Sequence, residues 1–300
     1  MAKTEDAIQA FKALIESYKA GNIQVDAIEE FVLNNEVSDT YYWKPFQLQL
    51  MDIVESIVSD SKCLKEISQA IESGIQKGYD QTHFRSEDEM LDSLEELFQL
   101  ALNQRVKNGT MCVEAVICFY ALLWNGFSEG EIRELRKDAL DLKNNVINFK
   151  GHAVSVSQRV MDLLYGYAQS EGVYRLSNSP LLNFYRYMPS EYLFRTYRSP
   201  KFGQTAFRIL RNHVNDLSAS LNFHHRFKCV AISINGAMKL IYDWEKKTEI
   251  MVTARSVVKN DIPKAILGEK IYFYNDLFTI VSKYYEEFRF WMDTNENKIE

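Results

Sequence analysis

The sequence predicts a mainly α-helical protein with a small β component, built as a helical N-terminal domain followed by a mixed α/β domain. Two patterns predict this fold class: apolar residues recur at helical spacing along most of the chain, and residues 146–156 have the pattern of a β-hairpin. A third observation concerns the boundary, because residues 76–85 have mixed polarity and contain Gly78, which is typical of a linker. We therefore expect a helical domain over residues 1–75 and a second domain over residues 86–300.

The N-terminal domain is predicted to consist of four helices. Apolar residues such as Phe11 and Ile15 lie on one face of the first helix. Asp60 or Ser61 is a suitable N-cap for the fourth helix, which Gly74 is expected to end. The predicted helices cover residues 5–20, 25–34, 38–58 and 60–74.

The first half of the second domain contains a helix, a tight corner, a short helix and the hairpin. Ser86 is expected to cap a first helix, and the almost wholly apolar run 111–124 predicts a helix that is buried on all sides. Gly126 ends this run, and Ser128 with Glu131 then predicts a capping box at the start of the short helix. The hairpin strands, 146–149 and 153–156, are joined around Lys150, Gly151 and His152.

The rest of the chain is predicted to be helical apart from residues 172–202, which contain three prolines. In that segment, residues 173–176 and 192–196 have the pattern of short strands. The amphipathic helix 203–220 carries Arg208 and Arg211 on one side. Further helices are expected after Ser157 and over residues 222–231, 237–247 and 275–292.

The composition excludes several classes of protein. With 46% hydrophobic and 25% charged residues, the chain is globular, and no apolar run approaches the ~20 residues of a membrane span. The four cysteines show no pairing pattern, which predicts free thiols in a reducing cytoplasm. No glycine-rich phosphate loop and no HExxH motif occurs, so no cofactor is expected. His224 and His225 lack a third ligand at a metal-binding spacing, so no metal site is predicted.

Charge is distributed unevenly along the chain. The formal net charge is −6, but residues 1–100 carry eight basic against twenty acidic side chains, whereas residues 186–228 carry eight basic against two acidic. Such a local excess of positive charge favours a polyanion as a partner. The alternative is an ordinary solvated basic face.

The corner and the hairpin resemble the tyrosine recombinases, also called phage integrases. That family has a glycine, an apolar residue and its first catalytic arginine at the corner, where this chain has Gly126, Phe127 and Ser128. The family's His-x-x-Arg motif falls on Phe223 to Arg226, so the arginine is kept and the histidine is not. The hairpin lysine of the family is also present. The resemblance implies a recombinase fold without a working active site, and the degenerate positions are Ser128, Lys150, Phe223 and Arg226.

The resemblance also implies an architecture and a partner. Residues 1–75 would be a core-binding (SAM-like) domain and residues 86–300 the recombinase-like domain, and in the family the two form a clamp around duplex DNA. The C-terminal helix is often exchanged between subunits in the family, so a homodimer through residues 276–292 and intramolecular packing are both open. The residues expected to contact DNA are Lys150, His152, Arg195, Arg198, Lys201, Arg208, Arg211, His224, His225, Arg226 and Lys228.

Three functions remain open from the sequence. The layout with its lost first arginine resembles the integrase-like master repressors of SPβ-type prophages, which implies a non-enzymatic, sequence-specific DNA-binding repressor that controls lysogeny. Such a protein is expected in the cytoplasm of a bacterial host, at the nucleoid. The alternative is a divergent recombinase that still breaks and rejoins DNA, with its nucleophile among Tyr272, Tyr274, Tyr284 and Tyr285. The third is a protein-interaction module, which the acidic N-terminal domain favours.

Overall fold

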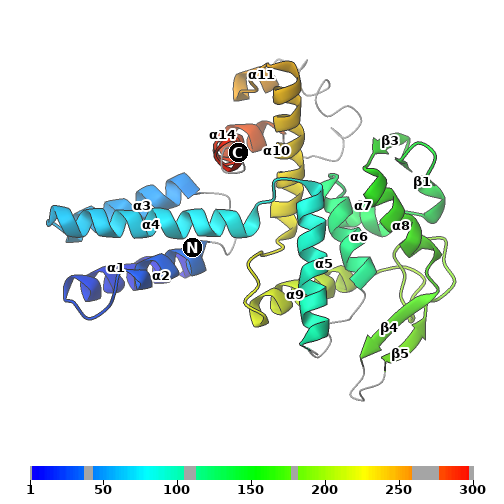
Figure 1. The fold of residues 1–300 in the computed structure, drawn as a ribbon, viewed down its shortest axis with the longest axis horizontal. Coiled ribbons are helices and arrows are strands. Elements are labelled where there is room, and N and C mark those ends of the chain that lie inside the picture. The colour runs from blue at the N-terminus through cyan, green and yellow to red at the C-terminus, as the bar shows by residue number, and fades with distance from the viewer. Residues whose placement is uncertain (1, 37–42, 105–112, 177–181, 259–276, 297–300) are drawn as a thin grey trace. The chain divides into compact units, whose positions relative to one another are not determined.

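The computed structural model describes residues 2–36, 43–104, 113–176, 182–258 and 277–296. The chain divides into two compact units, Met1–His83 and Phe84–Glu300. Both are mainly helical, and the strands that the structure describes belong to the second unit (Figure 1). The predicted fold class, mainly α with a small β component, is confirmed. None of the described helices is both long and apolar enough to span a membrane.

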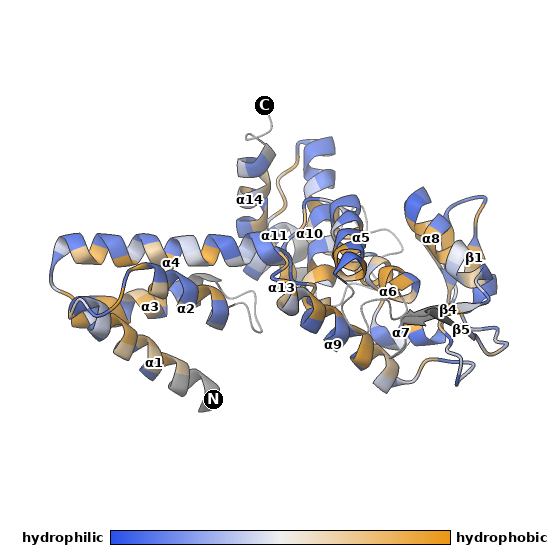
Figure 2. Cartoon of the chain, turned by 60° about the horizontal axis from the view of Figure 1, so that its bottom comes forward, coloured by the Kyte–Doolittle hydropathy of each residue, from blue (hydrophilic) through white to orange (hydrophobic). Residues whose placement is uncertain are grey.

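Four helices make up the first unit: α1 (Ala2–Lys19), α2 (Asp26–Glu36), α3 (Trp43–Ile57) and α4 (Ser61–Thr82). Figure 2 shows hydrophobic and hydrophilic residues alternating along α4, as an amphipathic helix requires. The apolar stripes meet in one core that includes Phe11, Ile15, Ile28, Val32 and Ile71. Asp60 caps α4, because its carboxylate accepts a hydrogen bond from the Cys63 amide at 2.8 Å. The presence of four helices is confirmed, and the predicted start of the third, over residues 38–42, lies outside the described residues.

The predicted end of α4 at Gly74 and the predicted linker over residues 76–85 are wrong. The helix continues to Thr82, and the division between the two units falls after His83. A Cβ atom on Gly74 would lie 2.8 Å from the Glu29 carbonyl oxygen, so the glycine allows α2 and α4 to pack closely. Glycine serves both in helix ends and in close helix packing, and the sequence pattern does not distinguish the two uses.

His83, the C-cap residue of α4, is buried with 2% of its surface exposed. Its ring stacks on the Tyr79 ring, with the ring centroids 3.5 Å apart. Burial lowers the pKa of the His83 imidazole to about 3, and a hydrogen bond with the Tyr79 carbonyl opposes this effect only in part. The folded protein therefore keeps His83 neutral, whereas the unfolded chain protonates it below about pH 6.5.

We predict that the free energy of unfolding falls as the pH decreases from about 6.5 towards 3, by up to about 1.4 kcal/mol per pH unit from this group. The contribution of neutral His83 is fully present above the unfolded-state pKa and is lost towards the folded-state value. The His83→Phe variant keeps a ring over Tyr79 without titrating, so its stability should decline less. Denaturant titrations of both proteins across this pH window provide the test, and parallel declines would contradict the prediction.

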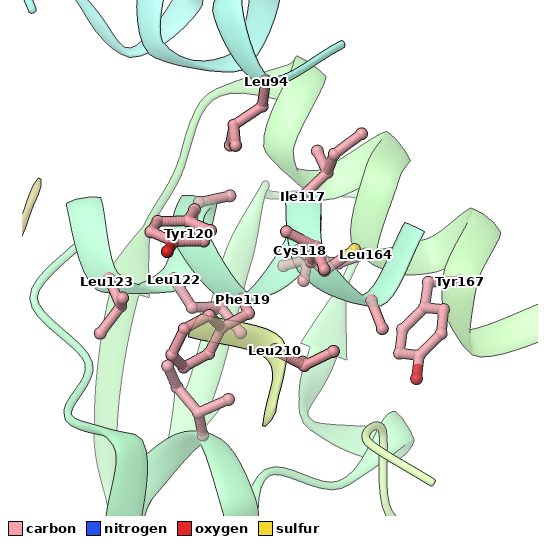
Figure 3. Packing of buried hydrophobic residues seen from close by; sticks show 14 of the residues in the cluster. Leu94, Ile117, Cys118, Phe119, Tyr120, Leu122, Leu123, Leu164, Tyr167 and Leu210 are labelled. Atoms are coloured by element: carbon pink, nitrogen blue, oxygen red, sulfur yellow. The ribbon is translucent and has the colours of Figure 1, made fainter. Parts of the chain in front are cut away.

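The second unit is built around α6 (Val113–Trp124), whose residues from Ala115 to Trp124 are all buried. Figure 3 shows Phe119, Leu122 and other α6 side chains packed with Leu164 and Leu210 from neighbouring helices. The helices around it are α5 (Glu87–Asn103), α8 (Gln158–Gln169), α9 (Gln204–Ser220) and α10 (Cys229–Thr248). The prediction of a helix that is buried on all sides is confirmed.

Two small antiparallel sheets belong to this unit. The short helix α7 (Glu129–Glu134) leads to the first sheet, formed in spatial order by β1 (Leu140–Asp141), β2 (Val146–Phe149) and β3 (His152–Ser155). The second sheet pairs β4 (Gly172–Leu176) with β5 (Leu182–Arg186). The predicted hairpin and the strand at 173–176 are confirmed. Residues 192–196 are not a strand, since Tyr192 makes only an isolated bridge with Arg136, and β5 was not predicted.

The predicted helix over residues 222–231 is also wrong. Asn222 adopts a left-handed conformation with φ of 48°, and α10 begins only at Cys229. The helix then runs through Asn235 and Gly236, both of which are buried. Packing of α10 against α6 outweighs the low helix propensity of these two residues.

The C-terminal segments pack against α10 of the same chain. These segments are α11 (Ala254–Val258), α13 (Leu277–Ile280), a π-helical turn (Val281–Tyr285) and α14 (Glu286–Glu296). The Phe288 ring lies edge-on to the Tyr242 ring at 6.5 Å, and the Tyr242 hydroxyl donates to Asp293 Oδ1 at 2.8 Å. Of the two open alternatives, the structure contains the intramolecular packing, and the homodimer stays a prediction.

A variant that ends at Asn275 tests the role of this packing. It should uncover Tyr242 and Ile241, which are 1% and 0% exposed in the full chain, and so should melt at a lower temperature. Exchange of the helix between two copies predicts that the full chain sediments as a dimer and the shortened chain as a monomer. Monomers in both cases, with and without DNA, would contradict the exchange.

Candidate nucleic-acid interface

Ser128 lies at the corner between α6 and α7, where Gly126 turns the chain with φ of 90°. The Ser128 hydroxyl accepts a hydrogen bond from the Glu131 amide at 3.3 Å and donates one to Glu131 Oε2 at 2.7 Å. The same carboxylate accepts a hydrogen bond from the Ser128 amide at 2.8 Å. The predicted capping box is confirmed. Ser128, which the sequence resemblance assigns to the position of the first recombinase arginine, thus stabilises a helix start and carries no positive charge.

A hollow of about 380 Å³ opens beside this corner. Its lining includes Ser128 from the corner, Arg211 from α9, Cys229 from α10 and Tyr284 from the π-helical turn. Burial raises the pKa of the Cys229 thiol to about 12, so this sulfur is not a thiolate at neutral pH. The lining thus combines the Arg211 guanidinium and the Tyr284 phenol with neutral hydroxyl groups and the Glu129 carboxylate.

The tyrosines that the sequence analysis names as candidate nucleophiles have different surroundings in the structure. Tyr284 lines the corner hollow. Tyr285 is 1% exposed, and its hydroxyl donates a hydrogen bond to Glu245 Oε2 at 2.6 Å. Burial, followed by this hydrogen bond, raises the pKa of Tyr285 far above its usual range, which is unsuited to a nucleophile. Tyr272 and Tyr274 lie outside the described residues.

Three arginines line a second hollow, of about 360 Å³, which we call the arginine hollow: Arg133 of α7, and Arg208 and Arg211 of α9. Arg211 Nη1 is 2.7 Å from Glu129 Oε1, a carboxylate in the same lining. Helical spacing predicts the shared side of Arg208 and Arg211, and both do face this hollow. Helical spacing does not predict that Arg133 joins them, because only the tertiary structure brings α7 beside α9.

The loop between α9 and α10 holds Arg226 and the two adjacent histidines. Burial lowers the pKa of the half-buried Arg226 guanidinium, and the described residues include no carboxylate in an ion pair with it. Phe223, which the sequence resemblance assigns to the histidine position, is 8% exposed and stacks on Phe227. His224 is exposed, whereas the His225 ring packs against Phe84 with centroids 4.6 Å apart. Nowhere in the described ranges do three or more His, Cys, Asp or Glu side chains gather as metal ligands would.

Arg195 is not available to DNA, contrary to the prediction. It is 3% exposed, and its guanidinium donates hydrogen bonds to four backbone carbonyls at 2.7–3.4 Å: those of Tyr167, Ala168, Ser170 and Leu193. Three of these carbonyls lie at the C-terminal end of α8, including its C-cap residue Ser170. The carbonyl groups at the end of a helix have no hydrogen-bond donor within that helix. A buried arginine that caps a helix has the same sequence signature as an exposed one in a basic segment.

The other predicted DNA contacts lie at separate places in the second unit. Arg198 is exposed, and its guanidinium lies 5.1 Å from the centre of the Tyr197 ring. Lys201 Nζ is 2.5 Å from Glu134 Oε2 and 4.3 Å from the centre of the Tyr192 ring. Lys150 lies in the hairpin turn and is exposed. His152 and Lys228 are half-buried.

Comparisons with known proteins find weak structural similarity and no sequence match. No family profile matches the sequence, and no curated protein has detectable sequence similarity to it. A solved structure, "Crystal structure of XerA recombinase", aligns with 96% of this chain and 98% of its own at 14% sequence identity and a TM-score of 0.43. This similarity is too low to assign the chain to a family.

Proposed function

We propose that this chain is a sequence-specific DNA-binding protein of recombinase type that binds duplex DNA without cutting it. The observation that carries the proposal is the corner, where the capping box occupies Ser128 at the position that strand transfer needs for an arginine. When an enzyme loses one hydrogen-bond donor that is positioned to stabilise the transition state, its catalytic rate typically falls by ~10²–10³. Ground-state contacts to phosphate need only charge and hydrogen-bond donors, which Arg208, Arg211 and Arg226 still offer.

A DNA-binding protein without strand cleavage acts most simply by occupying a site, as a transcriptional repressor does. The proposed role is the control of lysogeny in a prophage, within the bacterial cytoplasm. Selection of bound fragments from genomic DNA, followed by footprinting, tests this role. A footprint over a promoter would support repression. Failure to shift any duplex at low salt would instead favour the protein-interaction module.

Binding to duplex DNA should depend strongly on salt through the arginines of α9. Each neutralised phosphate contributes about −0.9 to the slope of log K against log salt. Arg208→Ala and Arg211→Ala should each weaken binding to all duplexes similarly and flatten this slope by about one contact. Arg255, exposed on α11, provides a matched control whose alanine variant should keep the wild-type slope. Unchanged slopes in both α9 variants would place the DNA elsewhere.

A divergent active recombinase is the second candidate, and the position of Tyr284 favours it. This tyrosine lines the same hollow as Ser128 and Arg211. A nicked suicide substrate traps a covalent protein–DNA adduct if the chain still cleaves. An adduct that disappears in Tyr284→Phe and persists in Tyr285→Phe would establish cleavage and reject the non-cutting protein.

A further inference from the structure

We infer that the arginine hollow is a binding site for a single phosphate group. The site takes the group whether it belongs to a DNA backbone or to a small phosphorylated compound, so the inference stands apart from the function proposed above. It rests on the charge of the lining, on the backbone at the start of α9 and on the rigidity of the hollow.

Positive charge exceeds negative charge in and next to the hollow. Four cations face two carboxylates there, and the six side chains are Arg133, Lys201, Arg208, Arg211, Glu129 and Glu134. Lys201 holds Glu134, and their hydrogen bond is the main reason that the pKa of Glu134 is lowered. Arg133 Nε lies 3.3 Å from the other oxygen of the same carboxylate. Arg133 uses its Nε group in this contact, and the Nη groups of the same guanidinium carry the further N–H donors that an anion can accept from.

The first turn of α9 adds backbone donors to the same lining. Gln204 and Thr205 begin this 17-residue helix and both line the hollow. The N-cap residue Gly203 supplies no side-chain cap, and the first turn contains no acidic residue. The amide groups at such a helix start have no intrahelical acceptors, and the helix dipole favours an anion there. Three arginines and the first two residues of α9 therefore line one hollow, a combination that suits phosphate recognition.

The hollow is held rigidly, so little entropy is lost when an anion binds. Phe207 lies in its lining, is 1% exposed, and packs against the rings of Phe119 and Phe202 at 5.0 and 5.3 Å. Ile132, which is 0% exposed, anchors α7 in the same core. Both helices that carry the arginines are thus fixed by the interior of the unit.

Glu129 opposes anion binding in the absence of a ligand. Its carboxylate occupies the Arg211 guanidinium at 2.7 Å, and both side chains are about a third exposed. A bound phosphate competes with this carboxylate for the same donors. Removal of the Glu129 charge should therefore strengthen phosphate binding, and this sign differs from the effect expected of the arginine variants.

Calorimetric titration of the full chain with inorganic phosphate at constant ionic strength tests the site. Arg133→Gln and Arg211→Gln should each weaken phosphate binding about tenfold to a hundredfold, because each removes a charge-assisted hydrogen bond. Glu129→Gln should strengthen it severalfold, a gain that misfolding does not produce. Arg255→Gln, which changes the charge by the same amount on α11, should bind phosphate as the wild type does.

Two results would overturn the inference: no saturable phosphate binding by the wild type, or wild-type affinity in Arg133→Gln. The same variants distinguish the sources of the phosphate. If a DNA backbone supplies it, Arg133→Gln lowers duplex affinity as well, and free phosphate competes with the duplex. If a small phosphorylated compound supplies it, duplex affinity is unchanged in Arg133→Gln. Phosphate binding by a chain that binds no duplex would support this site and reject the proposed function.

Discussion

Replacing Arg195 by methionine is expected to lower the free energy of unfolding by about 3–5 kcal/mol. Methionine keeps most of the side-chain volume and removes the guanidinium. The last turn of α8 would then lose the donor that satisfies its carbonyls, and buried acceptors without partners are costly. The stacking of the guanidinium near the rings of Tyr167 and Tyr187, at 5.6 and 5.0 Å, would also be lost.

Arg198→Met is the matched control, since Arg198 lies three residues away and is exposed. Its effect on stability should stay within about 0.5 kcal/mol. Denaturant unfolding of both variants gives the comparison, and duplex affinity should be measured at a temperature at which both are folded. A normal unfolding curve with reduced duplex affinity in Arg195→Met would show that Arg195 contacts DNA after all.

Replacing Arg226 by alanine is expected to weaken duplex binding by roughly 1.5–3 kcal/mol, the range of a hydrogen bond to a charged group. Only the sequence resemblance assigns Arg226 to the second catalytic arginine of the recombinases, and this assignment stays a prediction. A guanidinium fork fits two phosphate oxygens in the ground state as well as in a transition state. Arg226→Lys should recover part of the loss, because it keeps the charge and loses the fork.

The stability of the same variant separates a phosphate contact from a structural role. Arg226 is half-buried and, within the described part of the chain, has no carboxylate in an ion pair, so its burial costs energy that alanine would not. The melting temperature of Arg226→Ala should therefore not fall. A lower melting temperature with unchanged duplex affinity, measured on one preparation, would reject the phosphate contact. Ser128→Arg should not restore cleavage on its own, since Phe223 still occupies the histidine position.

Much of the candidate site depends on contacts that sequence patterns do not encode. Arg195 and Arg198 are near neighbours in one basic segment, yet one caps α8 in the interior and the other is exposed. Tyr284 and Tyr285 are adjacent, yet one lines the corner hollow and the other is buried against Glu245. Net charge along a segment predicts that a polyanion is attracted. It does not predict which side chains the fold uses for its own hydrogen bonds.

The sequence by itself determined the features that depend on neighbours within a few residues. The capping box at Ser128 needs only the residue three positions on, and the hairpin at 146–156 needs only its turn and its alternating strands. The buried position of α6 also follows from local composition, because an uninterrupted apolar run has no face that favours water. These parts were predicted correctly for a physical reason, since the interactions that form them are short-range.

Only the tertiary structure decided the features that depend on distant partners. Gly74 lies inside α4 where α2 approaches it, and α10, which packs against α6, continues through the buried Gly236. The position of Arg133 of α7 beside Arg208 and Arg211 of α9 likewise needs segments that are remote in sequence. In each case the energy of packing exceeds a local preference of about 1 kcal/mol or less, so the local pattern alone gives the wrong result or none.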